Sequence, residues 1–114
     1  MSRDWQLFFL DLIDFCQQIH AYTGHLDRVG FESSRLVFDA TVRNLELIGE
    51  AAKHIPESVR QQLPEIPWQD MVGARNIFAH AYFGVDRDLV WHTIRHEIPP
   101  MLAALLAAKD KVIP

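Results

Sequence analysis

The stretch WQLFFLDLIDFCQQIHAYTG, residues 5–24, shows the clearest helical periodicity in the chain. Its apolar residues recur every three or four positions, which places them on one face of an α-helix: Trp5, Phe8, Phe9, Leu12, Phe15, Cys16 and Ile19. The pattern predicts an amphipathic helix over about residues 4–22, and Gly24 marks its end. A helix of this kind needs partners for its apolar face.

The same periodicity continues into the middle of the chain. A second helix is expected to start after the capping candidates Ser33 and Ser34 and to stop at Pro56. The segment PESVRQQLP, residues 56–64, predicts a short extra helical turn. A third helix is expected from Pro67, because a missing N–H costs nothing in the first turn of a helix.

A fourth helix is expected after Asp86, which is placed to cap it. The two prolines Pro99 and Pro100 fall inside its apolar pattern and should kink it. No segment alternates with a period of two. We therefore predict an all-α protein, with residues 1–114 forming a single domain: an antiparallel up-down four-helix bundle with one short extra helical turn and a kinked last helix.

Composition limits the class of protein. The 114 residues carry a net charge of −4, which argues against nucleic-acid binding through a broad basic face. The single cysteine, Cys16, cannot form a disulfide within the chain, and this fits a reducing compartment. Because Asp4, Asp11 and Asp14 interrupt the first apolar run, it is neither a signal peptide nor a membrane span. We expect a soluble, cytoplasmic protein.

The stretch GARNIFAHAYFGVD, residues 73–86, gathers polar residues in an otherwise apolar segment. Asn76 and His80 are four residues apart and share a helix face, and the long side chain of Arg75 can bend toward them. A histidine suits proton transfer near neutral pH, and an arginine suits a phosphate. Spacing alone leaves the ordinary reading open, in which these residues and Tyr82 are surface, capping and packing residues.

The pattern Arg75-Asn76-x-x-x-His80-x-Tyr82 resembles the R-x4-H-x-Y motif of the HepT toxin family, a branch of the HEPN domain ribonucleases. The flanking blocks resemble that family as well, and the similarity runs in order over essentially the whole chain: NLELIGEAA at 44–52, IPWQDMVGARN at 66–76, and FGVDRDLVW at 83–91. The sequence shows no departure from the family pattern at the motif positions.

This resemblance implies a HEPN-like homodimer that acts as a metal-independent endoribonuclease without a cofactor. It also implies the toxin role in a bacterial toxin–antitoxin pair. The partner would be an MntA-type minimal nucleotidyltransferase, which silences the toxin by transferring AMP from ATP onto the motif tyrosine. Carried over to this chain, Arg75 and His80 would be catalytic with Asn76 in support, Tyr82 would be the modified residue, and the substrate would be an RNA such as tRNA or mRNA.

Two other functions remain open at the level of sequence. The chain could be a non-catalytic adaptor that binds nucleotide or substrate for a neighbouring nucleotidyltransferase, with the Arg75–His80 cleft holding phosphate. It could also be an inert dimeric bundle that binds its partner and has no catalytic activity. The dimer itself is favoured by the extra apolar residues of the first helix and by Gly73, which would let another helix approach closely. The alternative is a monomer that buries these apolar residues in a large core of its own.

Further polar residues lie outside the motif. Glu50 follows Arg43 and Glu46 along the second helix. We expect either a salt-bridged surface there or a supporting role for Glu50, which would orient the motif through Arg75. His92 and His96 have a spacing compatible with two metal ligands, but no third ligand lies obviously beside them, and a solvated face is the preferred interpretation.

Overall fold

The computed structural model describes residues 4–79 and 86–113, and for residues 75–79 it describes the backbone alone. Within these residues the chain is helical and contains no strand. Four longer helical segments and two short helices, α2 and α4, follow one another, and the fourth longer segment is made up of α6, a π-helical turn and α7. The elements are α1 (Trp5–Thr23), α2 (Arg28–Ser33), α3 (Arg35–Ala52), α4 (Glu57–Gln62), α5 (Trp68–Ala79), α6 (Arg87–His92), the π-helical turn (Thr93–Glu97, the π turn) and α7 (Ile98–Val112).

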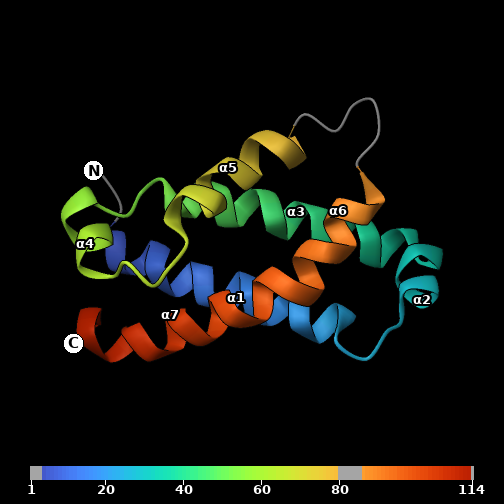
Figure 1. The fold of residues 1–114 in the computed structure, drawn as a ribbon, viewed down its shortest axis with the longest axis horizontal. Helices are drawn as coiled ribbons and strands as arrows, with labels where there is room; N and C mark the ends of the chain where they lie inside the picture. The colour runs from blue at the N-terminus through green and yellow to red at the C-terminus, as the bar shows by residue number, and fades with distance from the viewer. Residues whose placement is uncertain (1–3, 80–85, 114) are drawn as a thin grey trace.

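The long helices run up and down in alternation, as Figure 1 shows. α1 packs against α3 and α7, and α3 packs most extensively against α5. The start of α1 and the end of α7 lie at the same end of the bundle, near α4, whereas α2 lies at the opposite end (Figure 1). The predicted all-α bundle with a short extra helical turn is confirmed.

Side-chain caps set several helix starts. Ser34 caps α3 by accepting a hydrogen bond of 3.2 Å from the Val37 amide, and Asp86 caps α6 by accepting one of 3.1 Å from the Leu89 amide. Both capping roles were predicted. The sequence prediction missed α2, which Asp27 caps through the Gly30 amide at 2.8 Å. Six residues are too few to display a helical period, so only the cap could have indicated this helix.

One end of a predicted helix was misplaced. α3 stops at Ala52 rather than continuing to Pro56, although Ile55 is still buried at 1% exposure. Proline disfavours the α-helical region for Ile55, the residue directly before it. The amides of His54 and Ile55 already donate to the carbonyl oxygens of Ala51 and Ala52, three residues back, so the chain tightens after Ala52 and buries Ile55.

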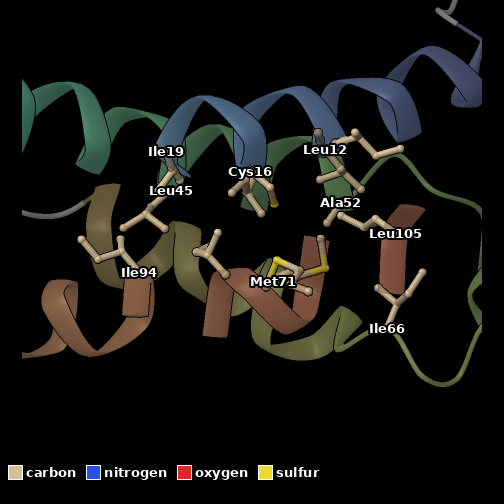
Figure 2. Close-up of a cluster of buried hydrophobic side chains, with 14 of the residues drawn as sticks. Leu12, Cys16, Ile19, Leu45, Ala52, Ile66, Met71, Ile94 and Leu105 are labelled. Carbon is tan, nitrogen blue, oxygen red and sulfur yellow. The ribbon is translucent and has the colours of Figure 1, made fainter. Parts of the chain in front are cut away.

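The core lies between α1, α3, α5 and the α6–α7 segment. Figure 2 shows apolar side chains from these helices converging there. Cys16 is fully buried among them, as the sequence predicted, and this burial raises the pKa of its thiol to about 12. None of the described helices is both long enough and apolar enough to span a bilayer.

The last helix is irregular, as predicted, but the irregularity lies before its prolines. Pro99 and Pro100 have no N–H and cannot donate to the carbonyl oxygens of Arg95 and His96 in α-helical geometry. The preceding π turn instead has the Ile98 amide donating to Thr93, five residues back. This wider turn accommodates the prolines without ending the helical run.

Candidate functional site

The motif residues lie at the end of α5 and in the segment that follows it. Arg75 and Asn76 belong to α5 (Trp68–Ala79). His80 and Tyr82 lie outside the described residues, as do the side chains of Arg75 and Asn76. The convergence of these four side chains into one site therefore stays a prediction, and the described residues show how the elements around them are positioned.

Residues of the IPWQDM block fix the start of α5. The indole Nε1 of Trp68 donates a hydrogen bond of 3.0 Å to the carbonyl oxygen of Leu63, and the Trp68 side chain is 7% exposed. Met71, one turn later, is 1% exposed and packs in the core (Figure 2). Burial of these two large side chains holds the helix that carries Arg75 and Asn76 against the bundle.

The NLELIGEAA block of α3 is the surface on which α5 rests. Leu45 and Ile48 are 1% exposed, and Gly49, Ala51 and Ala52 are also buried. Small residues in this block let two helices pack closely, and α5 is the helix with which α3 makes its most extensive contact. The sequence block thus has a structural explanation that is independent of chemistry.

The helix that follows the motif is fixed by three interactions. Asp86 caps α6, and Asp88 forms an ion pair with Arg28 of α2. The guanidinium of Arg87 lies 4.6 Å from the centroid of the Phe38 ring on α3. The two helices that precede and follow residues 80–85 are therefore both attached to α3 or its neighbour α2.

Glu50 has partners in the residues that directly follow its own helix. Its carboxylate lies 3.8 Å from the Lys53 amine and 3.7 Å from the His54 ring nitrogen, and its side chain is 43% exposed. Arg43 and Glu46 form another pair at 3.1 Å. The salt-bridged surface expected for this face is confirmed, whereas contact between Glu50 and Arg75 stays a prediction.

The two histidines of the fourth helical segment are exposed. The ring centroids of His92 and His96 are 4.8 Å apart across the π turn. Among the described residues, no group of three or more His, Cys, Asp and Glu side chains is arranged to hold a metal ion. The solvated face is the interpretation that the geometry supports.

The structure reveals a buried polar group on α3 that the motif does not include. The hydroxyl of Thr41 on α3 is fully buried and has no hydrogen-bond partner among the described residues. Thr23 and Thr93, by contrast, donate hydrogen bonds of 2.7 Å to the carbonyl oxygens of Ile19 and Leu89, four residues back. The spacing of apolar residues along α3 cannot show that the Thr41 hydroxyl lacks this bond.

Comparison with known proteins assigns the family. The family model described as "Ribonuclease HepT-like" matches residues 12–108. The chain is 35% identical over 98 residues to "Putative RNase MJ1380" of Methanocaldococcus jannaschii, covering 86% of this chain and 90% of that protein. It is 35% identical over 101 residues to "Probable ribonuclease HepT" of Thermococcus cleftensis, covering 89% and 92%. No solved structure gives a significant match. The chain belongs to the HepT-like ribonuclease family.

Proposed function

We propose that the chain is a metal-independent endoribonuclease and the toxin of a bacterial toxin–antitoxin pair, acting in the cytoplasm as a single HepT-like domain over residues 1–114. The observation that carries this proposal is the family match over residues 12–108, which includes the complete Arg75–Tyr82 motif. The packing of α5 against α3 supports it, because a catalytic helix needs a rigid support.

In the proposed reaction, His80 takes the proton from a ribose 2′-hydroxyl, and the 2′ oxygen attacks the adjacent phosphorus. The guanidinium of Arg75 stabilises the negative charge that builds up on the phosphorane oxygens. Asn76 orients the His80 ring or a phosphate oxygen. The bond from phosphorus to the 5′ oxygen then breaks, and a protonated imidazole gives its proton to that leaving oxygen, which yields a 2′,3′-cyclic phosphate and a 5′-hydroxyl.

A homodimer would supply both acid and base. Two copies related by a twofold axis would bring two histidines and two arginines to one cleft, so that one imidazole accepts a proton while the other donates one. The room beside Gly73 supports a close approach of another helix, because a Cβ built there meets no atom of the described chain within 4 Å.

Silencing would follow from AMP transfer. The phenolic oxygen of Tyr82 attacks the α-phosphate of ATP held by an MntA-type nucleotidyltransferase, pyrophosphate leaves, and the phenolic proton passes to solvent. The new phosphodiester carries a negative charge beside His80, which repels an RNA backbone, and the adenosine occupies the space that RNA needs.

The decisive experiment induces the wild type and the His80→Ala variant separately and compares cell growth and RNA integrity. We expect growth arrest and RNA cleavage with the wild type alone. Circular dichroism establishes that both proteins fold, and mass spectrometry establishes that Tyr82 is unmodified. Equal harmlessness of two folded, unmodified proteins would contradict the nuclease and favour the non-catalytic adaptor.

A further inference from the structure

A cavity of about 310 Å³ lies where α6 begins, between the end of α2 and the start of α3. Its lining consists of Glu32, Arg35, Phe38, Asp39 and Arg87. We name it the α3–α6 cavity, and it belongs to the end of the bundle that carries α2 (Figure 1). Pockets for small ligands have volumes from roughly 300 Å³ upward, so this cavity admits a group of the size of one nucleotide base.

The cavity lies close to the motif along the chain. Arg87 is the first residue of α6, and its side chain lines the cavity. Arg87 follows Tyr82 by five residues in the sequence, and a stretch of that length spans at most about 18 Å. An RNA strand held at the motif can therefore place a neighbouring base in the cavity.

Arg87 offers a platform on which a base can stack. Its guanidinium carbon lies 4.6 Å from the centroid of the Phe38 ring, and Phe38 is 8% exposed, so a core residue holds the guanidinium in place. Arg87 itself is exposed and forms no ion pair with another described residue. A planar guanidinium held over a ring can stack an unpaired RNA base on its opposite face.

The two carboxylates of the lining differ in how firmly they are held. Glu32 lies 3.4 Å from Arg28, which also pairs with Asp88 of α6, and this network joins α2 to α6. Asp39 pairs only with Arg35 among the described residues, at 3.5 Å between Oδ2 and Nε, and these side chains are 65% and 94% exposed. An exposed pair of this kind contributes little stability, so Asp39 and Arg35 can exchange their contact for a ligand.

This pair of side chains matches the edge of guanine. The Watson–Crick edge of guanine presents two adjacent donors, N1–H and the N2 amino group, which one carboxylate can accept together, and beside them the O6 acceptor, to which a guanidinium can donate. Adenine and cytosine place a ring-nitrogen acceptor next to their amino donor, where a carboxylate would meet a lone pair. Uracil has one N–H between two acceptors. Asp39 and Arg35, one turn apart on the same face of α3, supply the carboxylate and the guanidinium side by side.

We propose that the α3–α6 cavity is an RNA subsite for an unpaired guanine base near the cleaved bond. The base stacks on Arg87, its N1–H and N2 amino group donate to Asp39, and its O6 accepts from Arg35. This inference rests on the proposed function and narrows the substrate to RNA with an unpaired guanine close to the cleavage position. The net charge of −4 fits such a site, because recognition of a base edge needs no broad basic face.

Inosine tests the carboxylate contact, because it is guanosine without the N2 amino group. Fluorescence anisotropy gives dissociation constants for labelled uridine hexamers with one guanosine, inosine or adenosine, in a His80→Ala background that leaves the RNA intact. We expect the guanosine oligomer to bind at least tenfold more tightly than the adenosine oligomer, with inosine between them. Asp39→Asn should reduce these differences to within twofold. Asp110→Asn, an exposed aspartate in the last turn of α7, should preserve them.

Arg87→Lys tests the stacking contact at constant charge. Lysine has no planar face, so we expect the guanosine oligomer to bind at least fivefold more weakly. Arg43→Lys, an exposed arginine of α3 outside the cavity, should change the affinity by less than twofold. Circular dichroism shows whether each variant folds. A preference for guanosine that survives Asp39→Asn, or the lack of any such preference in the parent protein, would overturn the proposal.

A free nucleotide is the other possible source of a guanine base. We expect GMP to bind at least tenfold more weakly than the guanosine oligomer in calorimetry, because the strand is also held at the motif. Equal affinity for GMP that depends on Asp39 would overturn the RNA subsite and assign the cavity to a free nucleotide.

Cleavage assays with the wild type separate this inference from the proposed function. RNA cleavage by a protein without guanosine preference would contradict the subsite and leave the nuclease supported. Guanosine binding that depends on Asp39, in a folded and unmodified wild type that cleaves no RNA, would contradict the nuclease and leave the subsite supported.

Discussion

Arg95 in the π turn donates a hydrogen bond of 3.0 Å to the carbonyl oxygen of Thr23, the last residue of α1. The same guanidinium also donates to the carbonyl oxygen of Leu26 and lies 4.3 Å from the Trp91 ring centroid. One side chain therefore joins the irregular part of the last helical segment to the carboxyl end of the first helix. Its charge is satisfied there by carbonyl oxygens and an aromatic face.

Replacing Arg95 with methionine should destabilise the fold. The change removes charge-assisted hydrogen bonds to two carbonyl oxygens, and we expect the free energy of unfolding to fall by about 1–3 kcal/mol in urea denaturation. Arg35→Met is the matched control, because the Arg35 side chain is 94% exposed and pairs only with Asp39 on the same helix among the described residues. The control should change stability by less than about 0.5 kcal/mol, and equal effects would contradict the role assigned to Arg95.

The unpartnered hydroxyl of Thr41 predicts a gain in stability on substitution. Thr41→Val keeps the shape of the side chain and removes a buried polar atom that makes no hydrogen bond in the described structure, so the free energy of unfolding should rise by about 1 kcal/mol. Thr23→Val removes a hydroxyl that donates at 2.7 Å and should give no gain. If thermal unfolding shows Thr41→Val to be destabilising, the hydroxyl has a partner that the described residues do not include.

Burial of Cys16 predicts a pH dependence of stability. The folded thiol has a pKa of about 12 against an ordinary value of 9.0, so the unfolded chain loses its thiol proton first as pH rises. Stability is therefore lost as pH increases above about 9, by about 1.4 kcal/mol at pH 10 for this group alone. The measurement is chemical unfolding of the wild type and Cys16→Ala at pH 7 and pH 10. Identical losses in the two proteins would show that the thiol does not contribute.

A shared active site predicts a particular behaviour of mixed dimers. We expect co-purified heterodimers of His80→Ala and Arg75→Ala chains to cleave RNA much more slowly than the wild type, because the shared cleft would lack one imidazole and one guanidinium. Differently tagged chains allow the heterodimer to be isolated before the assay. Full activity in a dimer with a single His80 would contradict the two-histidine cleft.

The tyrosine of the motif should separate catalysis from silencing. Tyr82→Phe removes the hydroxyl that would accept AMP and leaves the ring, so the variant should cleave RNA and stop growth even when the nucleotidyltransferase is co-expressed. Growth assays with and without the partner give the result, and mass spectrometry shows whether AMP is added elsewhere. Rescue of growth by the partner would show that silencing does not require this residue.

The sequence by itself determined the helical architecture. Apolar residues at three- and four-residue spacing set the four long helical segments, because a helix with one apolar face must bury it against others. Ser34 and Asp86 marked helix starts correctly, since a cap depends on local hydrogen bonding that a short sequence specifies. The order of the motif and its flanking blocks was sufficient to indicate the family that the comparisons assign.

Only the tertiary structure decided how residues far apart in sequence meet. The attachment of the last helical segment to α1 needs Arg95 beside Thr23, and the attachment of α6 to α2 needs Asp88 beside Arg28. The π turn arises because two prolines must fit into a helix that is already packed against the core. Periodicity gives the face on which a side chain lies, but the partner across the bundle depends on helix packing, which no local pattern contains.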